Sequence, residues 1–317
     1  MIFNLKIKDI SFQLGSKKQS FKDYKFENPD WNEEKIKQKT GIEKQFILSE
    51  KETPLSLAEK ACHKLSYNYK DIDLLIYITQ APDYFLPSGS CILQDKLKLK
   101  KSVLAFDINL GCSGFIYGLS IAGSMINSKL ATKALIICSD GYSKYISKSN
   151  RTCRPIFSDA GSASIVEKNN NSKIGPFVFG TDGVGSKDLI VEGGAIRKPN
   201  EESELLMNGS QVFLFTLDTI PNELNKLLMI SDLKLNEVSW FVFHQASKFV
   251  IDNLIKKMDL PKEKVITNYA KFGNTVSSSI PICLSESFKD KQFNKGDKII
   301  LAGFGVGLSW GLCVVEI

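Results

Sequence analysis

Histidine is scarce in this chain of 317 residues, which holds only His63 and His244. Two histidines cannot build a multi-histidine metal site, so we expect no bound metal. No run of eighteen apolar residues occurs, and this excludes a membrane-spanning helix of ordinary length. The N-terminus MIFNLKIKDI alternates apolar and polar residues and lacks the long apolar stretch of a secretory signal.

The seven cysteines form no CxxC pair, and their number is odd. In a chain of this size the pattern favours reduced thiols and a cytoplasmic location. The formal net charge is +6, which gives no support for nucleic-acid binding but could steer an acidic partner. Because 43% of the residues are hydrophobic, the chain can build a large core, in one domain or in two of about 150 residues.

The second half of the chain repeats patterns of the first. Both halves contain an apolar run followed by Gln-Ala, in which Thr79 matches His244. Both also contain a turn before a small-residue helix, in which Cys112 matches Asn274. Thirty-three residues separate Thr79 from Cys112, and 30 separate His244 from Asn274. The matched segments are 73–82 with 239–247, 106–122 with 268–284, and 134–143 with 299–309.

We interpret the repeat as two α/β halves, residues 1–168 and 169–317, although any two α/β halves share some strand–turn–helix rhythm. Short apolar runs between helical stretches predict buried strands in α/β layers. We expect helices over 54–69, 247–258 and 278–290. The segment 169–189 is rich in Gly, Asn and Ser, which is typical of a junction and a surface hairpin.

Matched strand ends of duplicated halves converge near a pseudo-twofold axis, so we expect Cys112, His244 and Asn274 to meet. Cys112 stands at a turn between an apolar run and the small-residue helix SGFIYGLSIAGSMI. The positive end of a helix dipole favours thiolate, so we expect a lowered pKa and a nucleophilic thiol. The alternative is a structural cysteine in the core, the role that we assign to Cys62, Cys138, Cys283 and Cys313.

His244 and Asn274 each have an ordinary explanation as well. Strand-end histidines are often merely satisfied polar residues, and an asparagine before a helix is usually a cap. Together they supply neutral hydrogen-bond donors, which stabilise the enolate oxygen that forms when a malonyl thioester loses carbon dioxide. A Claisen enzyme that does not decarboxylate needs a base instead. The pair therefore favours decarboxylation.

The glycine-rich segment GFGVGLSWG (303–311) follows the apolar run KIILA. It lacks the Lys-Ser/Thr of a phosphate-binding loop. We expect the backbone to approach its neighbours closely here and to direct an N–H group, that of Val306, at an acyl oxyanion.

Four motifs surround the candidate residues: GCSGF around Cys112, HQAS around His244, GNTVSSSIP around Asn274, and the glycine-rich segment. In combination they resemble β-ketoacyl-acyl-carrier-protein synthase III, of the thiolase fold. The likeness extends over the chain through LPSGSCILQ (86–94), SDAGSASIV (158–166) and MNGSQVF (207–213). It implies a homodimer of five-layered αβαβα subunits that needs no cofactor. Cys112 would take an acyl group from a primer thioester, either acyl-coenzyme A or acyl-carrier protein, and condense it with malonyl-acyl-carrier protein.

The resemblance also implies roles for individual residues. His244 and Asn274 would hold the malonyl thioester oxygen, and the backbone amides of Cys112 and Val306 would hold the acyl oxygen. The expected acyl-pocket residues are Leu86, Phe157, Leu189, Met207 and Phe304. The expected residues at the entrance for primer or carrier are Lys39, Arg151, Lys248, Lys256 and Lys257.

Three positions depart from the family pattern. Lys39 and Lys35 stand where the family commonly has the arginine and tryptophan that clamp adenine, and Trp31 is out of register. Phe249 replaces an arginine that docks the carrier. These departures favour a specialised relative, acting in secondary metabolism or in acyl decoration of surface sugars.

Other functions stay open at this point. An acyltransferase on the same scaffold would pass the Cys112 acyl group to an amine or hydroxyl without decarboxylation. The pair of His244 and Asn274 argues against that reading. A non-catalytic partner subunit would not need these three residues, and a hydrolase would want an acid to orient the histidine.

Overall fold

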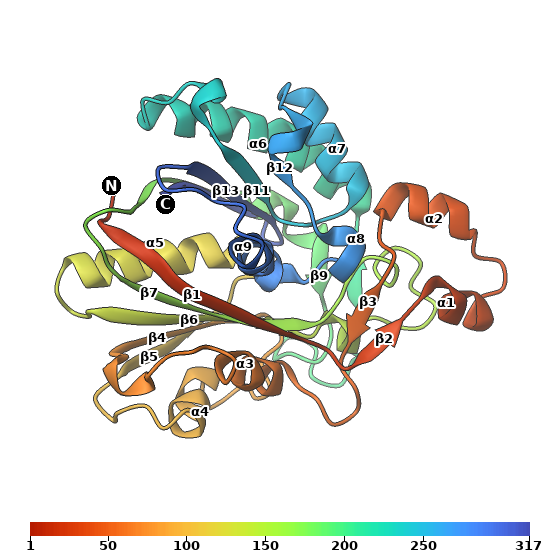
Figure 1. Cartoon of the computed structure of the whole chain (residues 1–317). Helices are drawn as coiled ribbons and strands as arrows, with labels where there is room; N and C mark the ends of the chain where they lie inside the picture. The colour runs from red at the N-terminus through yellow and green to blue at the C-terminus, as the bar shows by residue number, and fades with distance from the viewer.

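The structure, a computed structural model, describes residues 1–317 apart from the side chain of Phe26. These residues form a five-layered αβαβα sandwich (Figure 1). Two five-stranded sheets lie face to face with two helices between them, and further helices cover the outer face of each sheet. Among the described residues, no helix combines the length and apolar character that crossing a membrane requires.

The first sheet uses strands from the N-terminal half in the order β1-β7-β6-β4-β5. β4 is parallel to β5 and β6, whereas β7 is antiparallel to both of its neighbours. The helices α3 (Pro54–Cys62) and α4 (Gly89–Lys96) cover its outer face. The strands are β1 Leu5–Leu14, β4 Leu74–Ile78, β5 Leu104–Ile108, β6 Lys133–Asp140 and β7 Ala160–Lys168.

The second sheet uses strands from the C-terminal half in the order β12-β11-β13-β14-β8. β11 is parallel to β12 and β13, and β14 is antiparallel to both of its neighbours. The helices α6 (Gly209–Ile230) and α7 (Lys248–Lys257) cover its outer face. The strands are β8 Lys173–Thr181, β11 Trp240–Phe243, β12 Val265–Ile266, β13 Lys298–Gly305 and β14 Ser309–Glu316.

The two sheets have the same topology. β1, β4, β5, β6 and β7 correspond in chain order to β8, β11, β12, β13 and β14, with the same neighbours and directions. The predicted duplicated halves and five layers are confirmed. The expected hairpin in 169–189 is wrong for residues 173–181, which form the edge strand β8. Side chains of its apolar stretch PFVF pack in the cores on both faces of the sheet, and the flanking Gly and Asn residues obscured this strand.

Smaller elements lie around these layers. The short helices α1 and α2 and the antiparallel pair of strands β2 and β3 form a lobe at the right of Figure 1. β9 and β10 form a second hairpin. The bounds are β2 Lys17–Gln19, α1 Phe21–Glu27, α2 Glu33–Thr40, β3 Gln45–Ile47, β9 Leu189–Val191, β10 Leu205–Met207 and α8 Tyr269–Phe272.

The helices α5 (Gly114–Asn127) and α9 (Ser279–Lys289) fill the layer between the sheets, where the largest apolar cluster lies. Gly118 allows α5 to lie close to β4, since a Cβ there would stand 2.7 Å from the Ile78 side chain. The helices expected over 247–258 and 278–290 are found within one residue of those bounds as α7 and α9, whereas the helix expected over 54–69 ends at Cys62.

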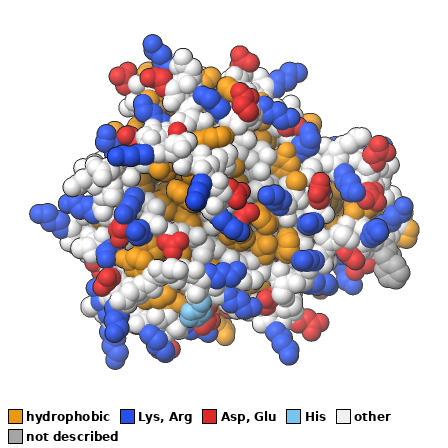
Figure 2. Space-filling view, in the orientation of Figure 1, with side chains coloured by type: hydrophobic (Ala, Val, Ile, Leu, Met, Phe, Trp, Pro, Cys, Tyr) orange, Lys and Arg blue, Asp and Glu red, His pale blue; other side chains and the backbone are white. Residues whose placement is uncertain are grey.

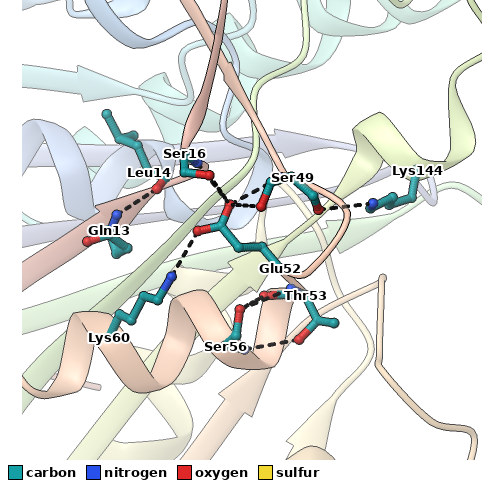
Figure 3. A network of polar contacts seen from close by, with 9 residues as sticks. All are labelled: Gln13, Leu14, Ser16, Ser49, Glu52, Thr53, Ser56, Lys60 and Lys144. Atoms are coloured by element: carbon teal, nitrogen blue, oxygen red, sulfur yellow. Dashed lines mark hydrogen bonds and ion pairs between the residues drawn. The ribbon is translucent and has the colours of Figure 1, made fainter.

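A buried carboxylate joins the start of α3 to the end of β1 (Figure 3). Glu52 is 7% exposed, and its Oε2 accepts hydrogen bonds from the backbone N–H and hydroxyl groups of Ser16 and Ser49 at 2.7–3.2 Å. Its Oε1 lies 2.8 Å from Nζ of Lys60. Burial would raise the pKa of Glu52, but Lys60 and Ser16 outweigh burial and lower it to about 2.

Glu52→Gln should reduce the free energy of unfolding at pH 7 by about 1–3 kcal/mol, because buried donors lose their acceptor. The folded-state pKa of about 2 lies below the ordinary value of 4.5. The stabilisation from the carboxylate is therefore present above pH 4.5 and is lost as the pH falls toward 2. Urea denaturation at pH 7 and at pH 3 should show the difference between wild type and variant shrinking at the lower pH.

The matched control is Glu33→Gln, which breaks an exposed ion pair with Lys37. Exposed pairs contribute little, so this variant should stay within about 0.5 kcal/mol of wild type. A Glu52→Gln difference that does not change with pH would contradict this account of the network.

Candidate active site

The structure brings Cys112, His244 and Asn274 to one place, around Val276. Cys112 lies two residues before α5, His244 directly follows β11, and Asn274 lies between α8 and the 3₁₀ helix η6 (Val276–Ser278). The three side chains are at most 5% exposed. The Val276 side chain packs in the same apolar cluster as Cys112, and its backbone forms hydrogen bonds with Asn274 and with the His244 ring.

The environment of the Cys112 thiol differs from expectation. Burial raises the pKa of this thiol to about 12, and the charge of Asp140 adds to the rise. A hydrogen bond from the backbone of Val306 opposes the rise only in part. The predicted lowering of the pKa is therefore wrong, because loss of hydration outweighs the helix terminus. Near pH 7 the sulfur is therefore a thiol.

His244 is held as a neutral imidazole. Burial lowers its pKa to about 3, although a hydrogen bond with the backbone of Val276 opposes the shift. Its Nδ1 lies 2.7 Å from Oγ of Ser279, and Phe304 meets the ring edge-on with centroids 5.8 Å apart. When Ser279 donates to Nδ1, the proton of the neutral ring is on Nε2, which is then a hydrogen-bond donor.

Asn274 is oriented by its own backbone neighbours. Its Oδ1 accepts the N–H of Val276 at 2.9 Å. Its main chain bonds to Ile156 and Ser158 at 2.9 and 2.8 Å, which fixes the turn against the first half of the chain. Because Oδ1 is occupied in this way, the amide NH₂ remains as the group that can donate to a substrate.

The glycine-rich segment 303–311 runs directly over Cys112. A Cβ on Gly303 would lie 2.6 Å from the Cys112 carbonyl oxygen, and one on Gly305 would lie 2.9 Å from its sulfur. Only glycine allows this approach. The approach brings the backbone of Val306 to the thiol, and the two N–H groups expected to hold an acyl oxygen lie on these adjacent segments.

Three of the five expected acyl-pocket residues pack in one apolar cluster with Cys112. They are Phe157, Leu189 and Met207. Leu86 does not, since it is 82% exposed on the loop after β4, and Phe304 packs in the cluster beneath the second sheet, against His244. Sequence reasoning missed other members of the Cys112 cluster, namely Tyr142, Cys153, Leu205 and Val276.

The basic residues expected at an entrance are exposed, and most are paired with acids. Arg151 pairs with Asp30, Lys248 pairs with Asp252, and Lys257 lies 3.9 Å from Asp218. Lys39 on α2 and Lys256 on α7 are exposed. Trp31 is only 4% exposed and packs on Tyr24 with ring centroids 5.8 Å apart, so its face is not presented to solvent.

Sequence reasoning also missed the residues that position the three candidate catalytic groups. Ser279 contacts His244, and Ser277 forms hydrogen bonds with Asp140. The signal was present in the serine run 277–279, at the start of the small-residue helix that follows Asn274. Across the described side chains, no three His, Cys, Asp or Glu gather as a metal ion would need.

Comparison with known proteins agrees with this geometry. Residues 106–183 match the family model described as 3-oxoacyl-acyl-carrier-protein synthase III, and residues 228–317 match the model of its C-terminal part. The β-ketoacyl-acyl-carrier-protein synthase III of Clostridium perfringens is 35% identical over 296 residues, which are 90% of this chain and 91% of the relative. This chain belongs to the 3-oxoacyl-acyl-carrier-protein synthase III family. The resemblance inferred from the sequence motifs is confirmed.

Other members of the synthase III family match over nearly the whole chain. The Clostridioides difficile relative is 34% identical over 312 residues, 94% of each chain. A crystal structure of a 3-oxoacyl-acyl-carrier-protein synthase III superposes with a TM-score of 0.95 at 36% identity, covering 99% of this chain and 100% of the other. The Thermus thermophilus synthase III superposes with a TM-score of 0.90 at 30% identity, covering 98% of both.

The raised thiol pKa predicts how Cys112 reacts with a neutral alkylating reagent. Only the thiolate reacts, and its fraction grows tenfold with each pH unit well below the pKa. With a pKa of about 12, alkylation by iodoacetamide should rise from pH 7 to pH 9 without reaching a plateau. Peptide mass spectrometry measures the rate at Cys112, and the exposed Cys91 serves as the internal control. A plateau below pH 8 would show an activated thiolate instead.

Proposed function

We propose that this protein catalyses a decarboxylating Claisen condensation between an acyl group carried on Cys112 and malonyl-acyl-carrier protein. The products are a 3-oxoacyl-carrier protein and carbon dioxide. The observation that carries the proposal is the arrangement of neutral donors, His244 and the Asn274 amide, beside a buried thiol. Membership of the synthase III family supports the same reaction.

In the first half-reaction the sulfur of Cys112 attacks the carbonyl carbon of a primer thioester. A carbon–sulfur bond forms to Cys112, the bond to the primer carrier breaks, and the thiol proton passes to the departing thiolate. The backbone N–H groups of Cys112 and Val306 would hold the negative oxygen of the tetrahedral intermediate. Phe157, Leu189 and Met207 would surround the acyl chain, since they pack with Cys112.

In the second half-reaction the malonyl group loses carbon dioxide, and the electrons of the broken bond form an enolate. His244 and Asn274 would donate hydrogen bonds to the enolate oxygen. The enolate carbon then attacks the acyl group on Cys112, and the sulfur leaves and takes up a proton. No side chain has to remove a carbon-bound proton, which suits a site whose histidine has a pKa of about 3.

The same pKa separates this proposal from the acyltransferase alternative. Passing the acyl group to an amine or hydroxyl requires a base that accepts the proton of the nucleophile. An imidazole with a pKa of about 3 is a weak base near pH 7. His244 in this environment therefore suits condensation better than acyl transfer. A hydrolase would likewise need a base to accept a proton from water.

We propose that acyl carrier protein docks over α2 and α7, where Lys39, Lys248 and Lys256 lie. Figure 2 shows basic side chains on this part of the visible face, with acidic ones between them. Acyl-coenzyme A is the alternative primer donor. The buried face of Trp31 offers no stacking surface for adenine, so we propose a carrier-bound primer and a specialised pathway. No cofactor takes part, and the seven free thiols suit a cytoplasmic location.

We also propose a homodimer that pairs through β5. This strand forms one edge of the first sheet, and Leu104 on it is 39% exposed. In the nearby loop after β4, Tyr84, Phe85 and Leu86 are 62–82% exposed. An apolar edge strand beside an apolar loop is a surface that proteins normally cover. A second copy covers both, and this arrangement accounts for Leu86, which has no place in the pocket of its own chain.

Separate substitutions should divide the two half-reactions. Cys112→Ala should gain no acyl mass but should still convert malonyl-carrier protein to acetyl-carrier protein, because the enolate is protonated instead of condensing. His244→Ala and Asn274→Ala should load the acyl group and lose roughly 10²–10³-fold in decarboxylation rate, as removal of one oxyanion donor does. Intact-protein mass spectrometry of enzyme and carrier follows both half-reactions.

Wild type loaded from a panel of acyl-coenzyme A and acyl-carrier donors is the reference in that experiment. An acyl mass on Cys112 that malonyl-carrier protein never clears would favour the acyltransferase instead. Absence of any acyl mass would refute Cys112 as the nucleophile.

The dimer proposal predicts that Leu104→Lys shifts the protein toward monomer, because it puts a charge into the apolar edge on both copies. Sedimentation velocity should report the mass of two chains for wild type and of one for the variant at low micromolar concentration. Met229→Lys is the control, since Met229 is 75% exposed at the end of α6, away from this edge. A monomeric wild type would refute the proposal.

A further inference from the structure

Asp140 is a buried carboxylate that the proposed reaction does not use. It ends β6 and is 0% exposed. Its Oδ1 accepts the N–H of Gln80 at 2.8 Å, and its Oδ2 accepts the hydroxyl of Ser277 and, at 3.3 Å, the Ser277 N–H. The hydroxyl of Thr79 is a further donor to it. Asp140 therefore joins the loop after β4 to the 3₁₀ helix η6 in the other half of the chain.

The residue next to Ser277 has a strained backbone. Val276 has a φ of +52°, in the left-handed region that β-branched residues rarely adopt. Such a conformation is unfavourable and persists only where the surroundings impose it. Val276 is also fully buried, so its side chain cannot relax into solvent.

The 3₁₀ helix that begins at the strained residue orients both donors of the site. The N–H of Val276 holds Oδ1 of Asn274, and Ser279, which directly follows η6, holds Nδ1 of His244. If Val276 relaxed to a negative φ, its N–H would turn and the Asn274 amide would lose its fixed orientation. The rate of decarboxylation therefore depends on whatever keeps η6 in place.

We propose that Asp140 is a positioning residue, which holds Val276 in the left-handed conformation through Ser277 and so aims His244 and Asn274 at the malonyl thioester. The inference rests on the proposed function, because it assigns Asp140 to the decarboxylating half-reaction. It makes Asp140 the link by which the first half of the chain sets the geometry of the second.

A carboxylate suits this task better than an amide. Gln80, Ser277 and Thr79 direct four donors at Asp140, and an ionised carboxylate has about four lone-pair sites to accept them. An asparagine has one acceptor oxygen, so whichever way its amide turns, the NH₂ group faces the N–H of Gln80 or that of Ser277. Asp140→Asn should therefore break the link between Gln80 and Ser277 even though the side chain keeps its size.

The charge of Asp140 gives the test a second readout. It raises the pKa of the nearby Cys112 thiol, and the other groups that it influences, Tyr77, Cys138, Tyr142 and Tyr145, are buried or largely buried. Removing the charge should lower the Cys112 pKa and speed alkylation at pH 8. Loss of positioning should slow decarboxylation in the same variant. A general loss of structure would also expose Cys112 and quicken its alkylation, but it would expose the equally buried Cys283 as well, so alkylation of Cys283 should stay at the wild-type level.

Asp159 provides a matched control. It is also a fully buried carboxylate, and it accepts the N–H groups of Leu48 and Ser143 at 2.7 and 3.0 Å and the Ser143 hydroxyl. It has no hydrogen bond to η6. Asp159→Asn should lower Tm, because it leaves buried donors unpaired, and it should change the two half-reactions by the same factor.

The experiment measures malonyl-carrier decarboxylation, Cys112 alkylation and Tm for wild type and for Asp140→Asn, Ser277→Ala and Asp159→Asn. Asp140→Asn should slow decarboxylation by roughly 10²-fold, as small misplacements of catalytic groups do, while alkylation quickens. Ser277→Ala should slow decarboxylation less, because its N–H still reaches Asp140, and should leave alkylation unchanged. If Asp140→Asn does not fold, Ser277→Ala still tests the proposal.

A rescue experiment separates positioning from charge. Glycine adopts positive φ without strain, so in Val276→Gly the conformation at position 276 should depend less on the hydrogen bonds of Asp140. Asp140→Asn should therefore slow decarboxylation by a smaller factor in the Val276→Gly background than in wild type. Equal factors in the two backgrounds, or parallel loss of both half-reactions, would overturn the inference. Failure of wild type itself to decarboxylate the malonyl substrate would instead refute the proposed function.

Discussion

Close contact between the two duplicated halves is the constraint on which this site depends. Their backbones approach so closely because the residues between them are small. Ser113 and Ser309 share a hydrogen bond of 2.8 Å across the halves, and Ser162 and Ser278 share one of 3.2 Å. Gly303 lies against the Cys112 carbonyl, where a larger residue would collide. A thiol from one half thereby meets an imidazole and an amide from the other.

The same burial that assembles the site sets its electrostatics. It raises the pKa of Cys112 to about 12 and lowers that of His244 to about 3, so both groups are neutral across the physiological range. A site of neutral donors around a protonated thiol suits chemistry in which negative charge develops on a thioester oxygen. It is poorly suited to removing protons, and for this reason loss of carbon dioxide is the route to the carbanion.

The internal repeat was enough to predict that Cys112, His244 and Asn274 meet, because matched segments at similar spacing place equivalent strand ends together. Packing decided what the repeat could not. Cys112 was expected to be a thiolate but is a thiol, because the sequence pattern shows the start of a helix and not the depth at which the sulfur is buried. Leu86 and Phe304 were assigned to the pocket by resemblance, yet one faces solvent and the other packs on His244. The serine run 277–279 marked this segment, but only side-chain positions show that Ser277 bonds to Asp140 and Ser279 to His244.

The central claim is that decarboxylation supplies the carbanion that removes the acyl group from Cys112. The most direct test is a single turnover with acyl-loaded enzyme and malonyl-carrier protein labelled in the free carboxyl group. The account predicts one labelled carbon dioxide released for each 3-oxoacyl product, with Cys112 returned to the free thiol. Loss of the acyl group from Cys112 without carbon dioxide release would contradict it.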